Sequence, residues 1–456
     1  MTTANFSTPG ERPLTGRELS GSPPALFTLA NGHTAAVGAA AVDAIAVDAV
    51  QREAAVDAVL AERGPAPQVD PIDPSFMDVV RRPPLVMQRG QGSYVWDEAG
   101  RRYLDFLQGW AVNALGHCPP EVQAALAEQS SLLITPSPAF HNRPAIELGR
   151  LLCRLTGAAR VALLNSGAEA SETAFKLARK WGRKYKRGAF GVVSTAGGFH
   201  GRTLAAMAAS GKPGWEALFP PYPPGFTKVP FGDLAAMEAA IDADTVALMV
   251  EPIQGEAGVV VPPDGYLRGL RELADRHDLL LILDEVQTGL GRTGRFLAQE
   301  HEGIRADITT LGKGLGAGLP VSAVLASERA ACFEPGDNGS THGGNPLLSH
   351  VALAVCRVIA TPPFLERVER RGLELAATLA GLAERWGRAA PRGRGLLAAI
   401  VFEDACAERL AELARDEGVL VNAARPNIVR LMPQLRVSSA EICEMSARLA
   451  RAHARL

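Results

Sequence analysis

The sequence predicts an α/β fold, with a mostly parallel sheet covered by helices on both faces and a smaller α+β domain. Short runs that are apolar throughout alternate with helical patterns beyond residue 155, and strands of this kind are buried on both sides. The runs are VALLN (161–165), FGVVST (190–195), VALMVEP (246–252), LLLILDE (279–285), DITTLG (307–312) and VSAVLAS (321–327). Helical patterns around GLLAAIVF and GVLVNAA, within about the last hundred residues, indicate the smaller domain.

Changes in composition along the chain predict its organisation. Residues 1–75 are rich in Pro, Gly, Ser, Thr and Ala, so we expect an N-terminal extension that is flexible or partly helical. The stretch GSYVWDEAGRRYLDF (92–106) alternates apolar and polar residues around a turn at 97–100, which predicts a β-hairpin. We therefore expect a segment at 76–140 that contributes to the small domain, a large domain at 141–345 and a C-terminal small domain at 346–456.

The overall composition points to a small-molecule ligand. With 456 residues, 47% of them hydrophobic, the chain is long enough for two or three packed units. A formal net charge of −2 gives no reason to expect nucleic acid or an anionic membrane as a partner. No apolar stretch approaches the roughly 18 residues that span a bilayer, and no export signal opens the chain, so we expect a cytoplasmic protein.

Neither the cysteines nor the histidines show the spacing of a metal site. The six cysteines are scattered without a CxxC pair, which also argues against a disulfide framework and suits a reducing compartment. We expect no metal, and surface, core or supporting roles for the histidines His117, His141, His200, His277 and His350.

An anion site is predicted where the first apolar run ends. After VALLN comes SGAEASETAFKLARK, whose pattern predicts a helix that starts near Ala168. The N–H groups of the first helical turn, together with the close approach that Gly167 permits, suit a phosphate group. The alternative is an ordinary helix cap in which Ser166 is the N-cap residue.

A carboxylate ends the run LLLILDE. Asp284 follows apolar residues, and an unpaired charge there would be costly to desolvate, so it needs a cationic partner. A structural salt bridge to an arginine is the alternative to a functional role. The glycines at 289, 291 and 294 have a GxGxxG spacing, but polar residues separate them from the strand, so we do not predict a dinucleotide site.

Lys313, in TTLGKGLGAG, ends the run DITTLG and lies between glycines. Because parallel strands end at one edge of a sheet, Asp284 and Lys313 should meet near the predicted phosphate site. A lysine, a buried carboxylate and a phosphate site together fit pyridoxal 5′-phosphate, with Lys313 as the Schiff-base residue and Asp284 beside the pyridine nitrogen. The alternative is a solvated lysine in a loop.

From about residue 76 onward, the chain resembles the class III (subgroup II) pyridoxal-phosphate aminotransferases. The segments that carry the resemblance are NSGAEASETAFKLARK, GGFHGRT, LILDEVQTGLGRTG, LGKGLGAGLP and STHGGNP, in that order along the chain. The resemblance implies the fold type I architecture of this family. It also implies a homodimer whose active site lies at the subunit interface, and the following cofactor residues: Ser166, Gly167, Ala168, Phe199, Asp284, Val286, Gln287, Lys313 and Thr341.

The resemblance also implies the substrates and the residues that bind them. The segments LDFLQGWAVNALGHCPPEVQAAL, ASGKPGW and PNIVRLMPQL are most similar to family members that act on N2-acetyl-L-ornithine, with 2-oxoglutarate as the amino acceptor. Arg202 and Ser340 would bind the distal carboxylate of the donor, and Arg430 the carboxylate of the keto acid. Glu256 would pair with Arg430 while the donor is bound. A surface salt bridge is the alternative for Glu256 and Arg430.

Two residues depart from the family pattern. Trp110 stands where we expect a smaller aliphatic residue, and His342 where we expect an aromatic one. These departures leave several specificities open: ornithine, succinylornithine, 4-aminobutyrate or diamine aminotransferases would share the cofactor residues. A racemase or aminomutase, or a scaffold protein without catalysis, are further alternatives.

Overall fold

The structure is a computed structural model in which residues 75–387 and 389–456 are described. The predicted extension at residues 1–75 lies outside the described part of the chain, apart from Ser75. Among the described residues, no single helix is long and apolar enough to cross a membrane. One bent pair, Pro346–Ile359 with Pro362–Trp386, reaches that length and composition when its two helices are counted together.

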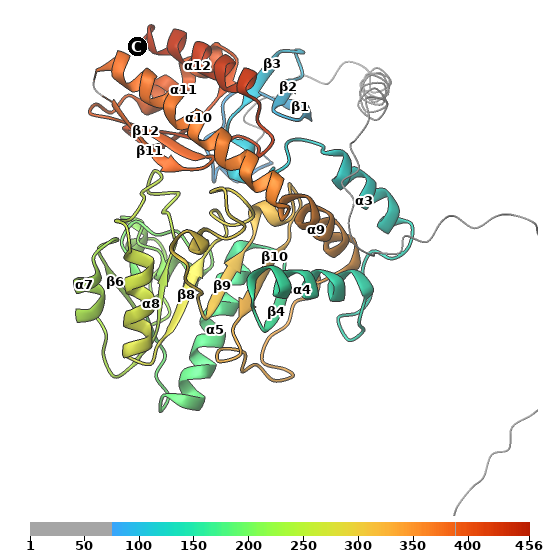
Figure 1. Ribbon diagram of the computed structural model, residues 1–456, viewed down its shortest axis with the longest axis vertical. Helices are drawn as coiled ribbons and strands as arrows, with labels where there is room; N and C mark the ends of the chain where they lie inside the picture. The colour runs from blue at the N-terminus through green and yellow to red at the C-terminus, as the bar shows by residue number, and fades with distance from the viewer. Residues whose placement is uncertain (1–74, 388) are drawn as a thin grey trace, which may run out of the picture. The chain divides into compact units, whose positions relative to one another are not determined.

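A seven-stranded sheet forms the larger part of the fold (Figure 1). From one edge to the other its strands are β4 (Arg160–Leu164), β10 (Ser322–Ala326), β9 (Ile308–Leu311), β8 (Leu280–Asp284), β7 (Thr245–Val250), β5 (Gly191–Thr195) and β6 (Phe226–Val229). β10 runs antiparallel to β4 and β9, and the strands from β9 to β6 pair in parallel. The predicted mostly parallel sheet is confirmed.

Each predicted apolar run holds one strand of this sheet. Every residue of β7, β8 and β9 is buried, because helices cover both faces of the centre. The sequence did not predict β6, whose residues Thr227 and Lys228 are exposed at the edge of the sheet. With exposed residues on both faces, β6 lacks the continuous apolar run that marks the central strands.

Helices pack on the two faces of the sheet. They are α4 (Arg143–Thr156), α5 (Gly167–Tyr185), α6 (Leu204–Ala209), α7 (Leu234–Ala239) and α8 (Tyr266–Arg276). Ile282 of β8 belongs to the core formed with α5 and α6, whereas its neighbours Leu281 and Leu283 belong to the core formed with α7 and α8. Successive side chains of a strand point to opposite faces, so one apolar strand contributes to both cores.

Two smaller sheets accompany the large one. The predicted hairpin is present as β2 (Tyr94–Asp97) and β3 (Arg102–Asp105), which join β1 (Met87–Gln91) and β13 (Val419–Leu420). The other sheet is antiparallel, in the order β11 (Ala389–Arg394), β12 (Leu397–Phe402), β15 (Ile428–Leu431) and β14 (Asn422–Arg425). Because β3 pairs with β13, the segment at 76–140 shares a sheet with the C-terminal region. The exact domain limits remain a prediction.

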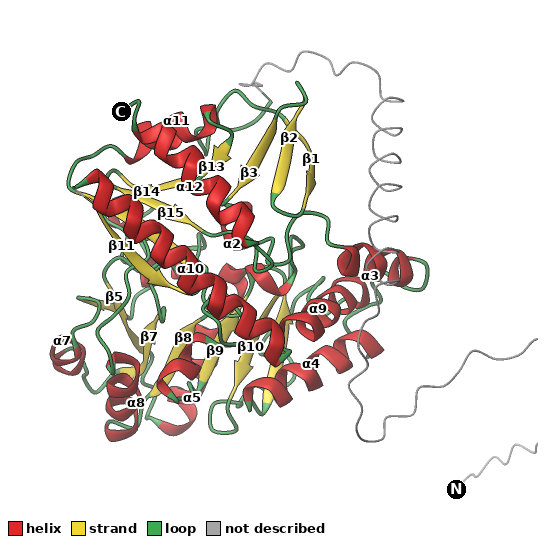
Figure 2. Ribbon diagram, turned by 45° about the horizontal axis from the view of Figure 1, so that its top comes forward, coloured by secondary structure: helices red, strands yellow, loops and turns green. Residues whose placement is uncertain are grey.

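Helices complete the C-terminal region (Figure 2). The long helix α10 (Pro362–Trp386) packs on β11 and β12, and α12 (Ser439–His453) packs on α10 and on α11 (Ala407–Asp416). In the same region as the hairpin lie α2 (Gln108–Ala111) and α3 (Pro120–Ser130), and α3 packs on α9 (Pro346–Ile359). The described residues also form three short 3-10 helices: η1 (Trp215–Ala217), η2 (Ala298–Glu302) and η3 (Lys313–Leu315).

Candidate active site

Lys313 lies directly after the carboxyl end of β9, as the sequence predicted. Its backbone has a φ of 40°, in the left-handed region that is uncommon for a residue with a side chain. A Cβ on Gly312 would lie 3.2 Å from Val286, and one on Gly314 would lie 3.3 Å from Ala114. The flanking glycines therefore allow the backbone to pass close to its neighbours while it turns Lys313 into the site.

The surroundings of Lys313 favour a neutral amine. Burial is the main cause that lowers the pKa of Lys313 below its usual value. The charge of Glu256 opposes this effect, and the positive charge of Arg430 adds to it. A lowered pKa increases the share of neutral amine, which is the form that can accept a proton.

Asp284 is paired with a histidine. Its Oδ2 lies 2.7 Å from Nδ1 of His200, and its Oδ1 accepts hydrogen bonds from the Val286 amide (3.1 Å) and the Thr310 hydroxyl (2.9 Å). Burial alone would raise the pKa of Asp284, but the hydrogen bond and charge of His200, together with the two other donors, hold it below its usual value. The predicted cationic partner is thus His200, and not an arginine.

Sequence reasoning missed two residues of this cluster. His200, expected only in a supporting or core position, is fully buried against Asp284, and its place directly after Phe199 in GGFHGRT was the available signal. Glu251 is also buried and accepts a hydrogen bond from the Phe199 amide at 2.9 Å. Burial raises the pKa of Glu251 to about 7, with His200 opposing and Asp284 adding to the effect.

The start of α5 lies beside Lys313 and Val286. Ser166 is the N-cap residue and forms a reciprocal capping box with Glu169, so the alternative of a helix cap is correct as far as Ser166 is concerned. Among the described residues, none accepts a hydrogen bond from the amides of Gly167 and Ala168. A Cβ on Gly167 would lie 3.0 Å from Val286. The helix therefore presents free N–H groups to the same space.

Gln287 is a buried amide whose polar atoms have no partner in the described part of the chain. Neither its Oε1 nor its Nε2 forms a hydrogen bond with any described residue, although Gln287 is only 7% exposed. Gly255 lies so close that any Cβ there would overlap the Gln287 amide. Buried side-chain amides are almost always hydrogen-bonded in folded proteins, so Gln287 indicates a ligand atom at this position.

Arg430 and Glu256 form the ion pair that the resemblance implied. Nη1 of Arg430 lies 2.8 Å from Oε1 of Glu256. The Arg430 side chain is fully buried, and Oδ1 of Asn422 accepts hydrogen bonds from its Nε (3.1 Å) and Nη2 (2.9 Å). Burial alone would raise the pKa of Glu256, but the charges of Arg430 and Lys313 lower it.

Arg202 lies over the ring of Trp215. Its Cζ is 4.5 Å from that ring centroid and 6.0 Å from that of Phe199, and the two rings meet edge to face at 5.7 Å. Ser340 lies beside the residues that precede α5, and its Oγ accepts a hydrogen bond from Nδ2 of Asn165 at 2.9 Å.

Two residues of interest are exposed. Thr341 lines a surface cavity of about 300 Å³ together with residues 135–138 and 140–142, and no described contact joins Thr341 to Lys313. Trp110 is 49% exposed and lies on α2, where four consecutive residues have positive φ values. The described residues contain no cluster of His, Cys, Asp and Glu suited to a metal ion.

Comparison with known proteins agrees with this geometry. Residues 76–452 match the family described as "Aminotransferase class-III". "Acetylornithine aminotransferase 2" of Bordetella pertussis is 49% identical over 378 residues, which are 82% of this chain and 96% of that protein. The chain belongs to the class III aminotransferases. It is therefore a pyridoxal-phosphate-dependent aminotransferase that uses an amino donor and a keto acid, and its sheet and helices are those of fold type I.

The relatives of this aminotransferase are named after two different substrates, acetylornithine and ornithine. "Ornithine aminotransferase" of Bordetella pertussis is 44% identical over 373 residues, covering 80% of this chain and 90% of that protein. The solved ornithine aminotransferase of Toxoplasma gondii has a TM-score of 0.81 at 35% identity, covering 84% of this chain and 93% of that one. The N-acetylornithine aminotransferase of Stenotrophomonas maltophilia has a TM-score of 0.72 at 36% identity, covering 81% and 96% respectively.

Proposed function

We propose that this aminotransferase transfers the terminal amino group of N2-acetyl-L-ornithine to 2-oxoglutarate, giving N-acetylglutamate semialdehyde and glutamate. Curated relatives named acetylornithine aminotransferase, 47 to 49% identical to the chain, support this choice of donor. The ion pair between Glu256 and Arg430 is the structural observation that carries it.

The pair matters because the two substrates differ beside the reacting carbon. The donor has no carboxylate next to its terminal amine, so a free Arg430 would remain buried and unpaired, at a high cost in free energy. Glu256 neutralises Arg430 in that half-reaction. The carboxylate of 2-oxoglutarate then replaces Glu256 in a charge-assisted pair with the guanidinium group.

The residues around Lys313 fit the cofactor of the family. We assign the phosphate to the amides of Gly167 and Ala168, next to Ser166 and with Thr341 contributed from a second subunit. Phe199 and Val286 would contact the two ring faces. The unpartnered amide of Gln287 would bind the ring hydroxyl, and Asp284, kept ionised by His200, would bind the pyridine nitrogen. When bound, pyridoxal phosphate serves as an electron sink for the bonds of the substrate carbon.

Lys313 acts as the general base and acid. Its lowered pKa leaves a share of the amine neutral, so it can take the proton from the substrate carbon and later return it. Glu256 and Arg430 keep the local charge balanced during this transfer. At the other end of the site, the Asp284–His200 pair is itself buried from water.

Specificity for the acylated donor rests on the mouth of the site. We assign the distal carboxylate to Arg202, which the rings of Trp215 and Phe199 hold in place, with Ser340 as a second contact. We also expect Trp110 to affect the shape of the pocket for the donor. The relative named ornithine aminotransferase makes free ornithine the second candidate donor.

We further propose a cytoplasmic homodimer. Several large apolar side chains near the cavity of Thr341 are exposed, among them Leu132, Leu133, Ile134 and Phe140. Exposed apolar residues that cluster in this way mark interaction surfaces. Sedimentation velocity should give twice the mass of one chain, and a monomer that remains active would contradict the shared site.

The test of the donor uses each half-reaction separately. N2-acetylornithine should abolish the visible absorption band of the bound cofactor, and 2-oxoglutarate should then restore it with one glutamate formed per site. A band that responds to ornithine but not to acetylornithine would overturn the assignment. Product formed without any keto acid would indicate a racemase or aminomutase instead.

A further inference from the structure

Lys212, in the segment ASGKPGW, is a cation to which the proposed function gives no role. It follows Gly211, whose amide donates to the carbonyl of Gly198 (3.0 Å) and whose carbonyl accepts from the amide of Gly197 (2.9 Å). These bonds fix the backbone of Lys212 beside the loop that carries Phe199. Its side chain is half-buried.

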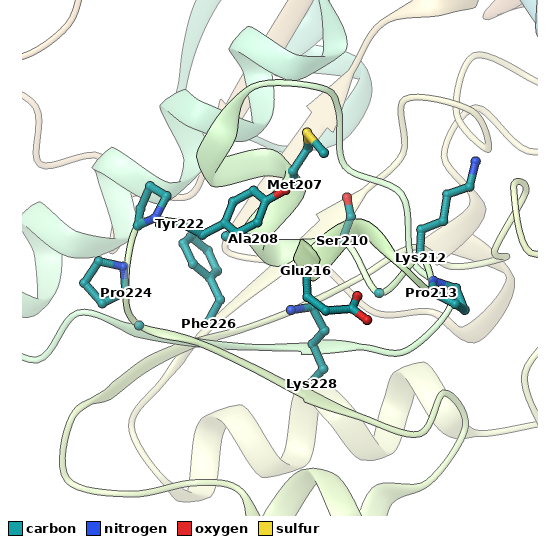
Figure 3. A pocket seen from close by; sticks show the side chains of 13 residues that line it. Met207, Ala208, Ser210, Lys212, Pro213, Glu216, Tyr222, Pro224, Phe226 and Lys228 are labelled. Atoms are coloured by element: carbon teal, nitrogen blue, oxygen red, sulfur yellow. The ribbon is translucent and has the colours of Figure 1, made fainter. Parts of the chain in front are cut away.

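The ammonium group of Lys212 has no carboxylate partner. Its Nζ lies 5.3 Å from the centroid of the Trp215 ring, the same ring over which Arg202 lies. Among residues 75–387 and 389–456, none forms an ion pair with Lys212. Figure 3 shows Lys212 and Lys228 on the lining of one cavity of about 370 Å³. In this cavity Lys212 extends away from the rings of Tyr222 and Phe226, whereas Lys228 lies beside Glu216.

Contacts connect the loop of Lys212 to that of Glu256. Nε2 of Gln254 donates to the carbonyl of Ala196 (2.9 Å), and Ala196 forms a bridge with Gly211. Burial is the first cause that lowers the pKa of Lys212, and the charge of Glu256 opposes it. Lys212 in turn helps to lower the pKa of Glu256. The two charges therefore act on each other across the mouth of the site.

Glu256 is the more exposed and less tightly held partner of its ion pair. Asn422 holds two nitrogen atoms of the buried Arg430, so the guanidinium group cannot follow a departing carboxylate. The Glu256 side chain is 30% exposed and accepts one hydrogen bond from Arg430. When a substrate carboxylate binds Arg430, Glu256 must move, and a displaced carboxylate in a half-buried place needs a new cation.

We propose that Lys212 receives the Glu256 carboxylate when a substrate carboxylate takes its place on Arg430. This inference rests on the proposed exchange at Arg430. Arg202 is committed to the distal carboxylate of the substrate and Lys313 to proton transfer, so among the described residues that act on Glu256 we assign the displaced carboxylate to Lys212. Lys212 thus stabilises the enzyme with keto acid bound, and has no such part in the complex with the donor.

The test is a double-mutant cycle of Lys212→Met and Glu256→Gln in the holoenzyme. The ligand is glutarate, which keeps both carboxylates of 2-oxoglutarate but has no carbonyl group to react, and calorimetry gives its Kd. K212M should weaken glutarate about fivefold, the size expected for a partly exposed charge pair. In the E256Q background, K212M should change the Kd less than twofold, because no carboxylate is displaced there.

Lys228→Met is the matched control, because Lys228 lines the same cavity but lies beside Glu216. It should change the Kd of glutarate less than twofold. An equal loss from K212M in both backgrounds would mean that Lys212 contacts the ligand itself, and no loss in the wild-type background would mean that it has no role. Either result overturns the inference.

The proposed function can fail independently of this inference. The wild-type response to N2-acetylornithine tests the donor, whereas the cycle with glutarate tests only the exchange at Arg430. A donor other than acetylornithine with an intact cycle would leave Lys212 as the acceptor of Glu256. Thermal unfolding midpoints of K212M and K228M that equal the wild-type midpoint would show that neither variant acts through misfolding.

Discussion

Two ion pairs at this site look alike in distance but differ in burial. The Asp284–His200 pair is closed on both sides, with side chains 4% and 0% exposed at 2.7 Å. In the Arg430–Glu256 pair, at 2.8 Å, the arginine is 1% exposed and the glutamate 30%. Asp284 also accepts two further hydrogen bonds, whereas Glu256 accepts none from the residues that the structure describes besides that of Arg430.

The difference separates a permanent pair from an exchangeable one. Breaking the first pair would leave a charge with no access to water, which makes it costly at every stage of the reaction. The second pair has one solvent-accessible member, so a substrate carboxylate can replace it at a small net cost. The first suits an unchanging group such as the cofactor, and the second suits substrates that alternate.

The largest effect is expected when the permanent pair is broken. Asp284→Asn should lower kcat/KM about 10³-fold with either substrate, because it removes a buried charge aimed at the reaction centre. It should also cost about 3 kcal/mol of unfolding free energy, since it leaves His200 without its anion. Activity assays and urea unfolding measure the two effects.

Asp278→Asn is the control for this prediction. Asp278 is an exposed partner of Arg329, so its loss should change both quantities very little. A D284N variant that resembles D278N would remove the distinction between the two pairs.

Breaking the exchangeable pair should affect the two half-reactions in opposite directions. Glu256→Gln should slow the half-reaction with N2-acetylornithine about tenfold, because Arg430 then faces an uncharged substrate end without a counter-ion. The Kd of 2-oxoglutarate should fall, since no internal carboxylate competes with it. Stopped-flow absorbance of each half-reaction would test this, and equal losses in both would contradict the exchange.

The two pairs should also differ in their response to pH. The pKa of His200 is raised, so its contribution to stability is complete below about 6.5 and is lost as pH rises through its folded value. The pKa values of Asp284 and Glu256 are lowered, so their contributions hold above the unfolded values and disappear as pH falls through the folded ones.

Unfolding free energies across the pH range would reveal this difference. The gap between wild type and His200→Gln should narrow at both acidic and alkaline pH. The gap between wild type and Glu256→Gln should narrow mainly at acidic pH, because Arg430 does not titrate and only the weaker effects of Lys313 and Lys212 are lost at alkaline pH. An alkaline loss as large as the acidic one would show that a titrating group, and not Arg430, is the main partner of Glu256.

The smallest effect concerns the start of α5. Ser166→Ala should cost about 1 kcal/mol of stability as the loss of an N-cap, and it should also weaken cofactor binding. Ser438→Ala removes the same capping box from α12, remote from the site, and should cost a similar amount without changing cofactor affinity. Equal cofactor affinities in the two variants would separate Ser166 from the phosphate site.

Much of the fold was readable from the sequence because the central strands are buried on both faces. Continuous apolar runs such as those of β7 and β8 have no other stable place in a folded chain. The edge strand β6 was missed because its two central residues, Thr227 and Lys228, are exposed and interrupt the apolar pattern. The order of the strands places Asp284 beside Thr310, and so close to Lys313.

The site, like the fold, has a part that the sequence predicted and a part that it did not. The sequence by itself determined that Lys313, Asp284 and the start of α5 meet, because strand ends and helix starts place groups by rule. Only the tertiary structure decided that His200 is the partner of Asp284, that Glu251 joins them, and how far Glu256 is exposed. Burial and the pairing of charges depend on segments that are far apart in the chain. The spacing of residues along the sequence does not give the distances between such segments in the fold.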